Sequence, residues 1–321
     1  MNIVLVSAIS GIPTVYPFEG YGGIERIVGD LAHELHKDHF VRLVAQKGSK
    51  IASESTELPV IELNGENEVA KLNFDDADAV IDFSHTKQSH HSPVDSFSVP
   101  FWSDRLGANP IFPTDAVRWS FGKEKWTTIY PGIDLTGFHS AKKQDYYIYM
   151  GRIAPYKGTH FAVYLAKRLG FNLKVVGHTG QFSNDKTYVE MVKHEAGNNV
   201  EFIGDVNEKE KIELLSHAKG LIMPSNWSTL KYGIPNPVES FGITAVESLA
   251  CGTPVFTNDL RSGIREIITP NTGRAFGMND WHKMLDVKFK EKDILKRAQY
   301  FSVKRYAQEL VEYVDGVISG N

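Results

Sequence analysis

Two glutamates in the C-terminal half of the chain, Glu239 and Glu247, are separated by seven residues that include Gly242. From Ile243 onward, apolar residues recur at three- and four-residue spacing, which predicts a buried helix with Glu247 about a turn and a half from its start. The first N–H groups of a helix have no partner within it, so they attract phosphates and sugar hydroxyls. Both carboxylates can therefore face one ligand over the helix start, although a capped surface helix with two solvated glutamates has the same pattern. The N–H groups concerned belong to Phe241, Gly242, Ile243 and Thr244.

A loop further upstream carries two cations, Arg152 and Lys157, five residues apart. The loop leaves a predicted strand over 146–150 at Gly151 and leads into a predicted helix over 159–169. Two cations on a glycine-containing strand-to-helix loop form a good clamp for a diphosphate. A pair of solvated cations is the alternative interpretation.

Near the N-terminus, Gly22 and Gly23 connect a predicted strand over 2–7 to a predicted amphipathic helix over 23–37. Glycines allow the backbone to approach a ligand closely. A plain tight turn into the helix is the alternative. The loop is not a dinucleotide-binding fingerprint, because no G-x-G-x-x-G run follows the strand.

Three histidines follow a predicted strand over 79–83. His85 is placed where a strand end would point it toward a ligand, and a surface or core histidine is the alternative. His90 and His91 lie nearby, but no carboxylate or cysteine has clear metal-ligand spacing to them. They are therefore interpreted as solvated.

Asp76 and Asp78 formally match a D-x-D metal-binding motif. They fall in a charged stretch before a strand, so a solvated turn is the preferred interpretation. Cys251, the single cysteine, lies within the apolar helical pattern and is interpreted as a small core residue rather than a nucleophile. A single cysteine also fits a reducing compartment.

The composition is that of a globular protein, with 321 residues, 42% hydrophobic and 23% charged. The formal net charge of −4 gives no reason to expect a nucleic-acid partner. No apolar run approaches the roughly 20 residues that span a bilayer, so no transmembrane segment is expected. The N-terminus lacks the basic region of a signal peptide. These features predict a cytoplasmic protein and leave peripheral association with the inner membrane face open.

Short apolar runs alternate with helical patterns along the chain, which predicts an α/β fold with parallel sheets covered on both faces. A turn at Pro131–Gly132 divides two such series and predicts two Rossmann-like domains that face a central cleft. The expected N-terminal domain comprises 1–137 and a C-terminal helix over 303–321, and the expected C-terminal domain comprises 138–302. Ligands of such sheets bind at the carboxyl ends of the strands.

The segment PVESFGITAVESLACGTPV resembles the E-x7-E signature of glycosyltransferase family 4 (group 1), whose members are retaining transferases with the GT-B fold. The segment from Gly151 to Gly158 resembles the family's G-R-x-x-x-x-K-G motif, and the segment from Gly22 to Arg26 its G-G-x-E-R motif. His85 is similar to a strand-end histidine of the family. The resemblance is near-continuous over 126–274 and thinner in the first domain.

The resemblance implies a role for each motif residue. Arg152 and Lys157 would hold the donor phosphates, and the loop with Gly22 and Gly23 would face them. Glu239 and His85 would contact the donor sugar. Glu247 would bind the nucleotide ribose.

The implied activity is that of a retaining hexosyltransferase. The donor would be a UDP- or GDP-linked sugar, and the acceptor a hydroxyl of a saccharide, a lipid-linked molecule or a small molecule. No metal or other cofactor is required by this scheme. Three alternatives stay open: a sugar phosphorylase, a nucleotide-sugar epimerase on the same fold, or a sugar-binding protein without catalysis. The loop over 224–238 is longer than is usual in the family, and the short first domain leaves acceptor binding undetermined.

Overall fold

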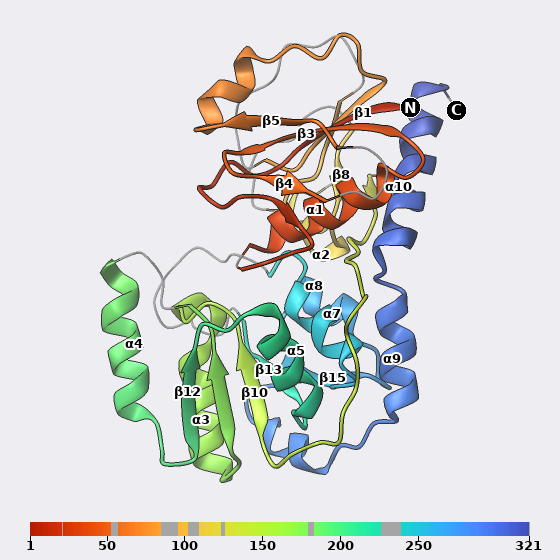
Figure 1. Cartoon of the computed structure of the whole chain (residues 1–321). Coiled ribbons are helices and arrows are strands. Elements are labelled where there is room, and N and C mark those ends of the chain that lie inside the picture. Colours follow the sequence, from red (N-terminus) through yellow and green to blue (C-terminus); the bar gives the residue numbers. More distant parts are fainter. Residues whose placement is uncertain are drawn as a thin grey trace. The chain divides into compact units, whose positions relative to one another are not determined.

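The computed structural model of the protein describes residues 1–20, 22–52, 57–84, 96–101, 109–122, 126–178, 183–225 and 239–320, without the side chains of 183–185. The described residues form two compact units (Figure 1). Met1–Asp134 and Tyr300–Asn321 make the N-terminal unit, and Leu135–Gln299 makes the C-terminal unit. The boundaries predicted from the sequence, 137/138 and 302/303, fall slightly later in the chain than these divisions.

Within its described residues, the N-terminal unit contains a five-stranded parallel sheet with the strand order β5-β3-β1-β6-β7. Its strands are β1 (Asn2–Val6), β3 (Phe40–Gln46), β5 (Val60–Leu63), β6 (Ala79–Asp82) and β7 (Ser96–Ser98). Alternate residues of these strands, such as Val4, Val44 and Val80, join Phe74 in a buried cluster on one face. The period-2 pattern of a strand therefore places the core, as expected for a sheet.

Helix α1 (Gly23–Leu35) packs against the C-terminal helix α10 (Val303–Ile318) in this unit (Figure 1). Ile27 and Leu31 of α1 and Leu310 of α10 are buried, because both helices carry an apolar stripe at helical spacing. The smaller elements are β2 (Val15–Tyr16), β4 (Lys50–Ile51), η1 (Glu66–Lys71), β8 (Ile111–Phe112), α2 (Asp115–Ser120) and β9 (Thr127–Thr128).

The C-terminal unit is built on a parallel sheet that has six strands in the described part of the chain, in the order β12-β11-β10-β13-β14-β15. The strands are β10 (Tyr147–Met150), β11 (Leu173–Val176), β12 (Val200–Gly204), β13 (Leu221–Met223), β14 (Val255–Asn258) and β15 (Gly273–Phe276). The helices are η2 (Pro155–Lys157), α3 (Thr159–Leu169), α4 (Ser183–Glu195), α5 (Glu208–His217), α7 (Ile243–Ala250), α8 (Gly263–Ile267), η3 (Trp281–Asp286) and α9 (Glu291–Gln299).

The helices of this unit lie on the two faces of its sheet (Figure 1). Tyr149 and Val175 of the sheet share a buried core with Val163 of α3 and Val189 of α4. Helix α7 packs on β13 and β14, and α5 packs against α7. The prediction of an α/β fold with parallel sheets is therefore confirmed.

The last two helices are separated at Phe301–Ser302, as the sequence predicts. The backbone there pairs with another segment of the N-terminal unit: Ile133 donates its N–H to the Phe301 carbonyl at 3.0 Å, and Val303 donates to the Ile133 carbonyl at 2.8 Å. The Ser302 side chain accepts from the Arg305 N–H at 3.4 Å and caps α10. The break is thus a strand-like bridge with a new helix start behind it.

Two sequence-based elements differ from the structure. Helix α4 starts at Ser183, earlier than the predicted 187, because its first turn is polar and gives no periodic signal. The predicted strand over 99–102 is absent from its described residues; β7 lies at Ser96–Ser98 instead, and Trp102 falls outside the described residues. Within the described ranges, no helix combines the length and apolarity needed to cross a lipid bilayer.

A substitution of Gly177, at the end of β11, would test how tightly the carboxyl edge of the C-terminal sheet is packed. Its φ is +143°, and a Cβ placed on it would lie 1.9 Å from the Gly151 carbonyl oxygen. Gly177→Ala should lower the free energy of unfolding by about 3 kcal/mol or more, since backbone strain and overpacking each cost 1–3 kcal/mol.

Gly170→Ala is the matched control, because Gly170 has a φ of +74° but no atom within 4 Å of its added Cβ. It should cost only about 1 kcal/mol for the left-handed conformation. Urea denaturation of both variants measures the difference. Equal losses in the free energy of unfolding would show that the close approach of Gly177 to Gly151 adds nothing to the cost of the substitution.

Candidate functional site

The predicted phosphate-binding loop leaves the carboxyl end of β10 and is held by close backbone packing. Gly151 begins the loop, and Gly158 ends it with a φ of +74°. A Cβ on Gly158 would lie 2.3 Å from the Pro224 carbonyl oxygen, so the loop runs directly against the chain that leaves β13. This packing fixes the place of Lys157, which closes the short helix η2.

Lys157 and Glu239, which lie 82 residues apart in the chain, form an ion pair with Nζ and Oε2 separated by 2.5 Å. Their side chains are 20% and 9% exposed. Ser225 donates its hydroxyl to the same Glu239 oxygen at 3.2 Å, and the Asn258 side chain donates to the Ser225 carbonyl. The structure thus brings together the residue predicted to bind phosphate and the residue predicted to bind sugar.

Arg152 lies on the same loop and is anchored by neighbouring phenols. Its Nη1 donates to the Tyr156 hydroxyl at 3.1 Å, and the Tyr149 hydroxyl donates to the Arg152 carbonyl at 2.8 Å. Burial raises the pKa of Tyr149 well above its usual value, so this phenol stays neutral. The backbone of Arg152 is therefore held by its own strand, and its guanidinium contacts Tyr156 of its own loop.

Helix α7 starts as the sequence predicts, at Ile243 after Gly242. Gly242 has a φ of +99°, and a Cβ there would lie 2.8 Å from Cγ1 of Ile264. The Gly263 N–H donates to the Glu239 carbonyl at 2.8 Å, which joins the loop before α7 to the start of α8. The first turn of α7, at Ile243 and Thr244, presents N–H groups that the helix itself cannot pair.

Glu247 lies within α7 and is 3% exposed. Its Oε1 accepts from Nζ of Lys211 on α5 at 2.7 Å, and the same Nζ is 2.6 Å from Glu208 Oε2. Lys211 was not among the residues chosen from the sequence. A signal was present: Lys211 lies one helical turn before Leu215, which is completely buried, so it faces the interior.

Lys143 is a second lysine that the sequence analysis missed. Its Nζ donates to the Ser216 carbonyl at 2.7 Å, the Cys251 carbonyl at 3.2 Å and the Thr253 hydroxyl at 2.6 Å. A cation is therefore shared by the C-terminal ends of α5 and α7, where carbonyl dipoles favour it. Burial lowers the pKa of Lys143 to about 8.

The N-terminal glycines occupy the start of α1, with Gly22 at a φ of +135° directly before Gly23. A Cβ on Gly22 would lie 2.6 Å from Oε2 of Glu25. Glu25 is 4% exposed and accepts from the Ser10 hydroxyl at 2.8 Å, and burial raises its pKa. The approach of this loop to a donor phosphate stays a prediction.

Several predicted residues lie outside the described residues: His85, His90, His91 and the part of the long loop from 226 to 238. Asp76 and Asp78 are described and have partners in the N-terminal unit. Asp76 pairs with Arg42 at 2.9 Å, which lowers the pKa of its carboxyl, and Asp78 accepts from the Asn2 N–H at 2.7 Å. Where the structure describes the chain, no three His, Cys, Asp or Glu side chains are grouped so that they could hold a metal ion.

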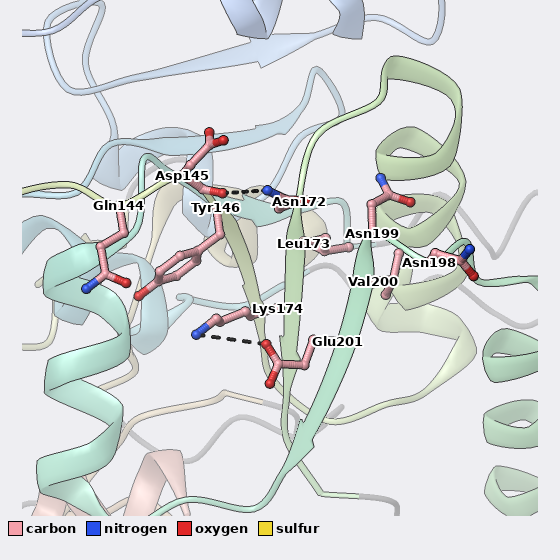
Figure 2. A pocket seen from close by; sticks show the side chains of 10 residues that line it. All are labelled: Gln144, Asp145, Tyr146, Asn172, Leu173, Lys174, Asn198, Asn199, Val200 and Glu201. Carbon is pink, nitrogen blue, oxygen red and sulfur yellow. Dashed lines mark hydrogen bonds and ion pairs between the residues drawn. The ribbon is translucent and has the colours of Figure 1, made fainter.

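A hollow of about 350 Å³ lies in the C-terminal unit, lined by residues at the amino ends of β10, β11 and β12 (Figure 2). Lys174 and Glu201 approach each other there at 3.9 Å, and the Lys174 ammonium lies 4.4 Å from the Tyr146 ring centre. Ligands of parallel sheets bind at the carboxyl ends of the strands. The hollow is at the opposite end of the sheet from Arg152 and Lys157 and is not part of the candidate site.

The sequence of the C-terminal unit matches a known family. Residues 137–287 match the sequence model described as glycosyl transferases group 1. Glycogen synthase of Mycobacterium tuberculosis H37Rv is 27% identical over 169 residues, which is 50% of this chain and 38% of that protein. An uncharacterized glycosyltransferase of Methanocaldococcus jannaschii, MJ1178, is 24% identical over 146 residues, 46% of this chain and 37% of its own length.

Solved structures match nearly the whole chain. AviGT4, a glycosyltransferase involved in avilamycin A biosynthesis, has a TM-score of 0.81 at 22% identity and covers 100% of this chain and 98% of its own. Sucrose-phosphate synthase from Thermosynechococcus elongatus has a TM-score of 0.74 at 16% identity, with both chains fully covered. Anabaena Alr3699/HepE in complex with UDP and glucose has a TM-score of 0.68 at 17% identity and covers 98% of this chain and 100% of its own.

The prediction that Cys251 is a core residue can be tested by its reactivity. The side chain is completely buried, and burial raises the pKa of its thiol to about 12. Because the thiolate is the reactive form, the folded protein should resist an aromatic disulfide reagent at pH 8 and react with one equivalent after denaturation. The absorbance of the released thiol measures both. Rapid labelling of the folded protein would place Cys251 at an accessible site.

Together, the parallel sheets, the paired motif residues of the C-terminal unit and the likeness to solved structures give the chain the fold of the GT-B glycosyltransferases, with residues 137–287 matching the group 1 family.

Proposed function

We propose that the protein is a retaining glycosyltransferase that moves a hexosyl group from a nucleoside-diphosphate sugar to a hydroxyl of an acceptor, without a metal ion. The observation that carries the proposal is the ion pair between Lys157 and Glu239 directly before the start of α7. A cation predicted to bind phosphate, a carboxylate predicted to bind sugar and a helix N-terminus meet there at the carboxyl end of a parallel sheet.

The donor diphosphate would replace Glu239 as the partner of Lys157. The Lys157 side chain is 20% exposed, so an incoming anion can reach it. Arg152, on the same loop, and the N–H groups at the start of α7 would take up the rest of the charge that develops on the leaving diphosphate. Each well-aimed donor to such a charge can be worth about 3–4 kcal/mol.

The exchange would leave the Glu239 carboxylate available to hydroxyls of the donor sugar, while Glu247 serves the ribose. The complexes of Anabaena Alr3699/HepE with UDP and glucose, UDP, and UDP-glucose support a donor of this class. Retention is inferred from the resemblance to family 4. In that scheme the leaving diphosphate helps to remove the proton from the acceptor hydroxyl. The acceptor would bind to the N-terminal unit, where the loop with Gly22 and Gly23 is the candidate contact, while His85 would contact the donor sugar.

A sugar phosphorylase is the second candidate, because Arg152 and Lys157 could bind inorganic phosphate as readily as a diphosphate. Incubation with a nucleotide sugar and a panel of hydroxyl acceptors separates the two. Release of nucleoside diphosphate that depends on the acceptor supports the transferase, whereas sugar 1-phosphate formed from a saccharide and inorganic phosphate, without any nucleotide sugar, supports the phosphorylase. An epimerase would convert the nucleotide sugar alone.

Removing either cation should impair the reaction. Arg152→Ala and Lys157→Ala should each lower kcat about 10²-fold or more, the scale of one lost donor to a developing charge. Arg168→Ala, which removes an exposed cation of α3, is the control and should react like wild type. Nucleoside diphosphate release measures the rates, with and without excess EDTA. Wild-type rates in both site variants would remove the cations from the mechanism, and loss of activity in EDTA would contradict metal independence.

The two glutamates should respond differently to neutralisation. Glu239→Gln frees Lys157 from its ion pair, so it should bind free nucleoside diphosphate at least as well as wild type but use the nucleotide sugar poorly. Glu247→Gln should weaken the binding of free nucleoside diphosphate about 10-fold or more, since one lost hydrogen bond to a charged group costs about 1.5–3 kcal/mol. Calorimetry and kinetics separate the effects. The assignment is wrong if both variants match wild type in each assay.

A further inference from the structure

Lys211 is an interior cation that the proposed chemistry leaves without a role. Its side chain is 13% exposed, compared with 53% for Lys37 and 60% for Lys283 on the surface. Its Nζ lies between two carboxylates, at 2.7 Å from Glu247 and 2.6 Å from Glu208. A lysine is seldom buried unless it is paired. The burial of Lys211 therefore has to be explained by the carboxylates with which it pairs.

The backbone around Lys211 is rigid. Helix α5 begins with a capping box, in which the Asn207 side chain accepts from the Glu210 N–H at 2.9 Å and the Glu210 side chain accepts from the Asn207 N–H at 3.0 Å. The Lys211 N–H donates to the Asn207 carbonyl at 2.9 Å, so Lys211 lies in the first complete turn. At the other end of α5 and α7, Lys143 joins the two helices. The C-terminal ends of α5 and α7 are thus joined by a contact that is independent of the pair between Lys211 and Glu247.

The Glu247 side chain is more deeply buried than that of Lys211, with 4% exposed compared with 13%. An unpaired charge at such a place is strongly unfavourable, and loss of one partner typically costs about 3–5 kcal/mol. Lys211 therefore compensates the charge of the Glu247 carboxylate and fixes where one of its oxygens points. An ionised carboxylate accepts hydrogen bonds from two hydroxyls, whereas a neutral one must donate with one oxygen.

We propose that Lys211 is a positioning residue for nucleotide recognition, which acts through Glu247 and sets the selectivity of the site for the ribose hydroxyls. The inference rests on the proposed function, because it assumes that Glu247 faces the ribose. It adds a residue that makes no contact with the nucleotide. It also gives α5 a part in donor selectivity that the motifs at Arg152, Lys157 and α7 do not include.

The experiment compares ribonucleotide with deoxyribonucleotide. The probes are UDP, GDP and their 2′-deoxy and 3′-deoxy forms, and calorimetry gives the ratio of dissociation constants for each pair. Lys211→Met keeps the apolar stem and removes the charge, and Lys211→Arg keeps the charge. Glu208→Gln is the matched control, because it changes the other partner of Lys211 and leaves the pair with Glu247 in place.

Lys211→Met should lower the preference for ribonucleotide about 10-fold, the effect expected for hydrogen bonds to a charged group. Lys211→Arg should restore most of the preference, and Glu208→Gln should retain it. The double variant Lys211→Met, Glu247→Gln has no unpaired buried carboxylate at this place, so it remains informative even where Lys211→Met alone unfolds. It should bind the ribonucleotide as weakly as Glu247→Gln, since Lys211 acts through Glu247.

Each failure has a separate meaning. Wild-type protein that binds neither UDP nor GDP overturns a UDP- or GDP-linked donor, and this inference with it. Nucleotide binding with an unchanged ribose preference in Lys211→Met overturns the inference alone. A double variant much weaker than Glu247→Gln also overturns it, because Lys211 would then contact the nucleotide directly.

Discussion

The candidate site depends on how cations balance the negative charges of two carboxylates, one just before a helix and one within it. Glu239 and Glu247 belong to the segment that forms the start of α7, and each is paired with a lysine from a distant segment. Without Lys157 and Lys211, two negative charges close in sequence would lie largely buried, at the place where the proposed function requires an anion to bind. The ion pairs allow one short helix to combine anion-attracting N–H groups with carboxylates that can bind hydroxyls.

Close backbone packing places these charges. Gly151, Gly158 and Gly242 all have positive φ angles, and an added Cβ on Gly158 or Gly242 would meet its neighbours at 2.3 or 2.8 Å. The loops can therefore approach one another only because glycine occupies these positions. Lys143 contributes at the other end of α5 and α7 by donating to the carbonyls of Ser216 and Cys251. The site is thus supported from the strand ends on one side and from the helix C-termini on the other.

The sequence predicted the elements better than it predicted their contacts. Periodicity located α3 at its observed ends, since its apolar spacing is clear and a glycine follows its last residue. The sequence also predicted the observed bounds of α5, although most residues of that helix are polar. It could not show that Lys157 meets Glu239, because that contact depends on β10 and β13 being neighbours in the sheet, and strand order is not contained in a local pattern. Lys211 and Lys143 were missed because a lysine in a polar helix or loop normally indicates solvent exposure.

The two ion pairs differ in exposure, and this difference suits different roles. Lys157 is 20% exposed and its partner 9%, whereas the values for Lys211 and Glu247 are 13% and 4%. The Lys157 side chain is more open to solvent than that of Lys211, so an incoming anion has better access to its ammonium. The second pair is better shielded, and separating it would leave a charge buried. Buried ion pairs seldom stabilise a fold more than apolar packing does. Under the proposed function, their presence around α7 is explained by exchange of the partner of Lys157 and by lasting orientation of Glu247 rather than by stability.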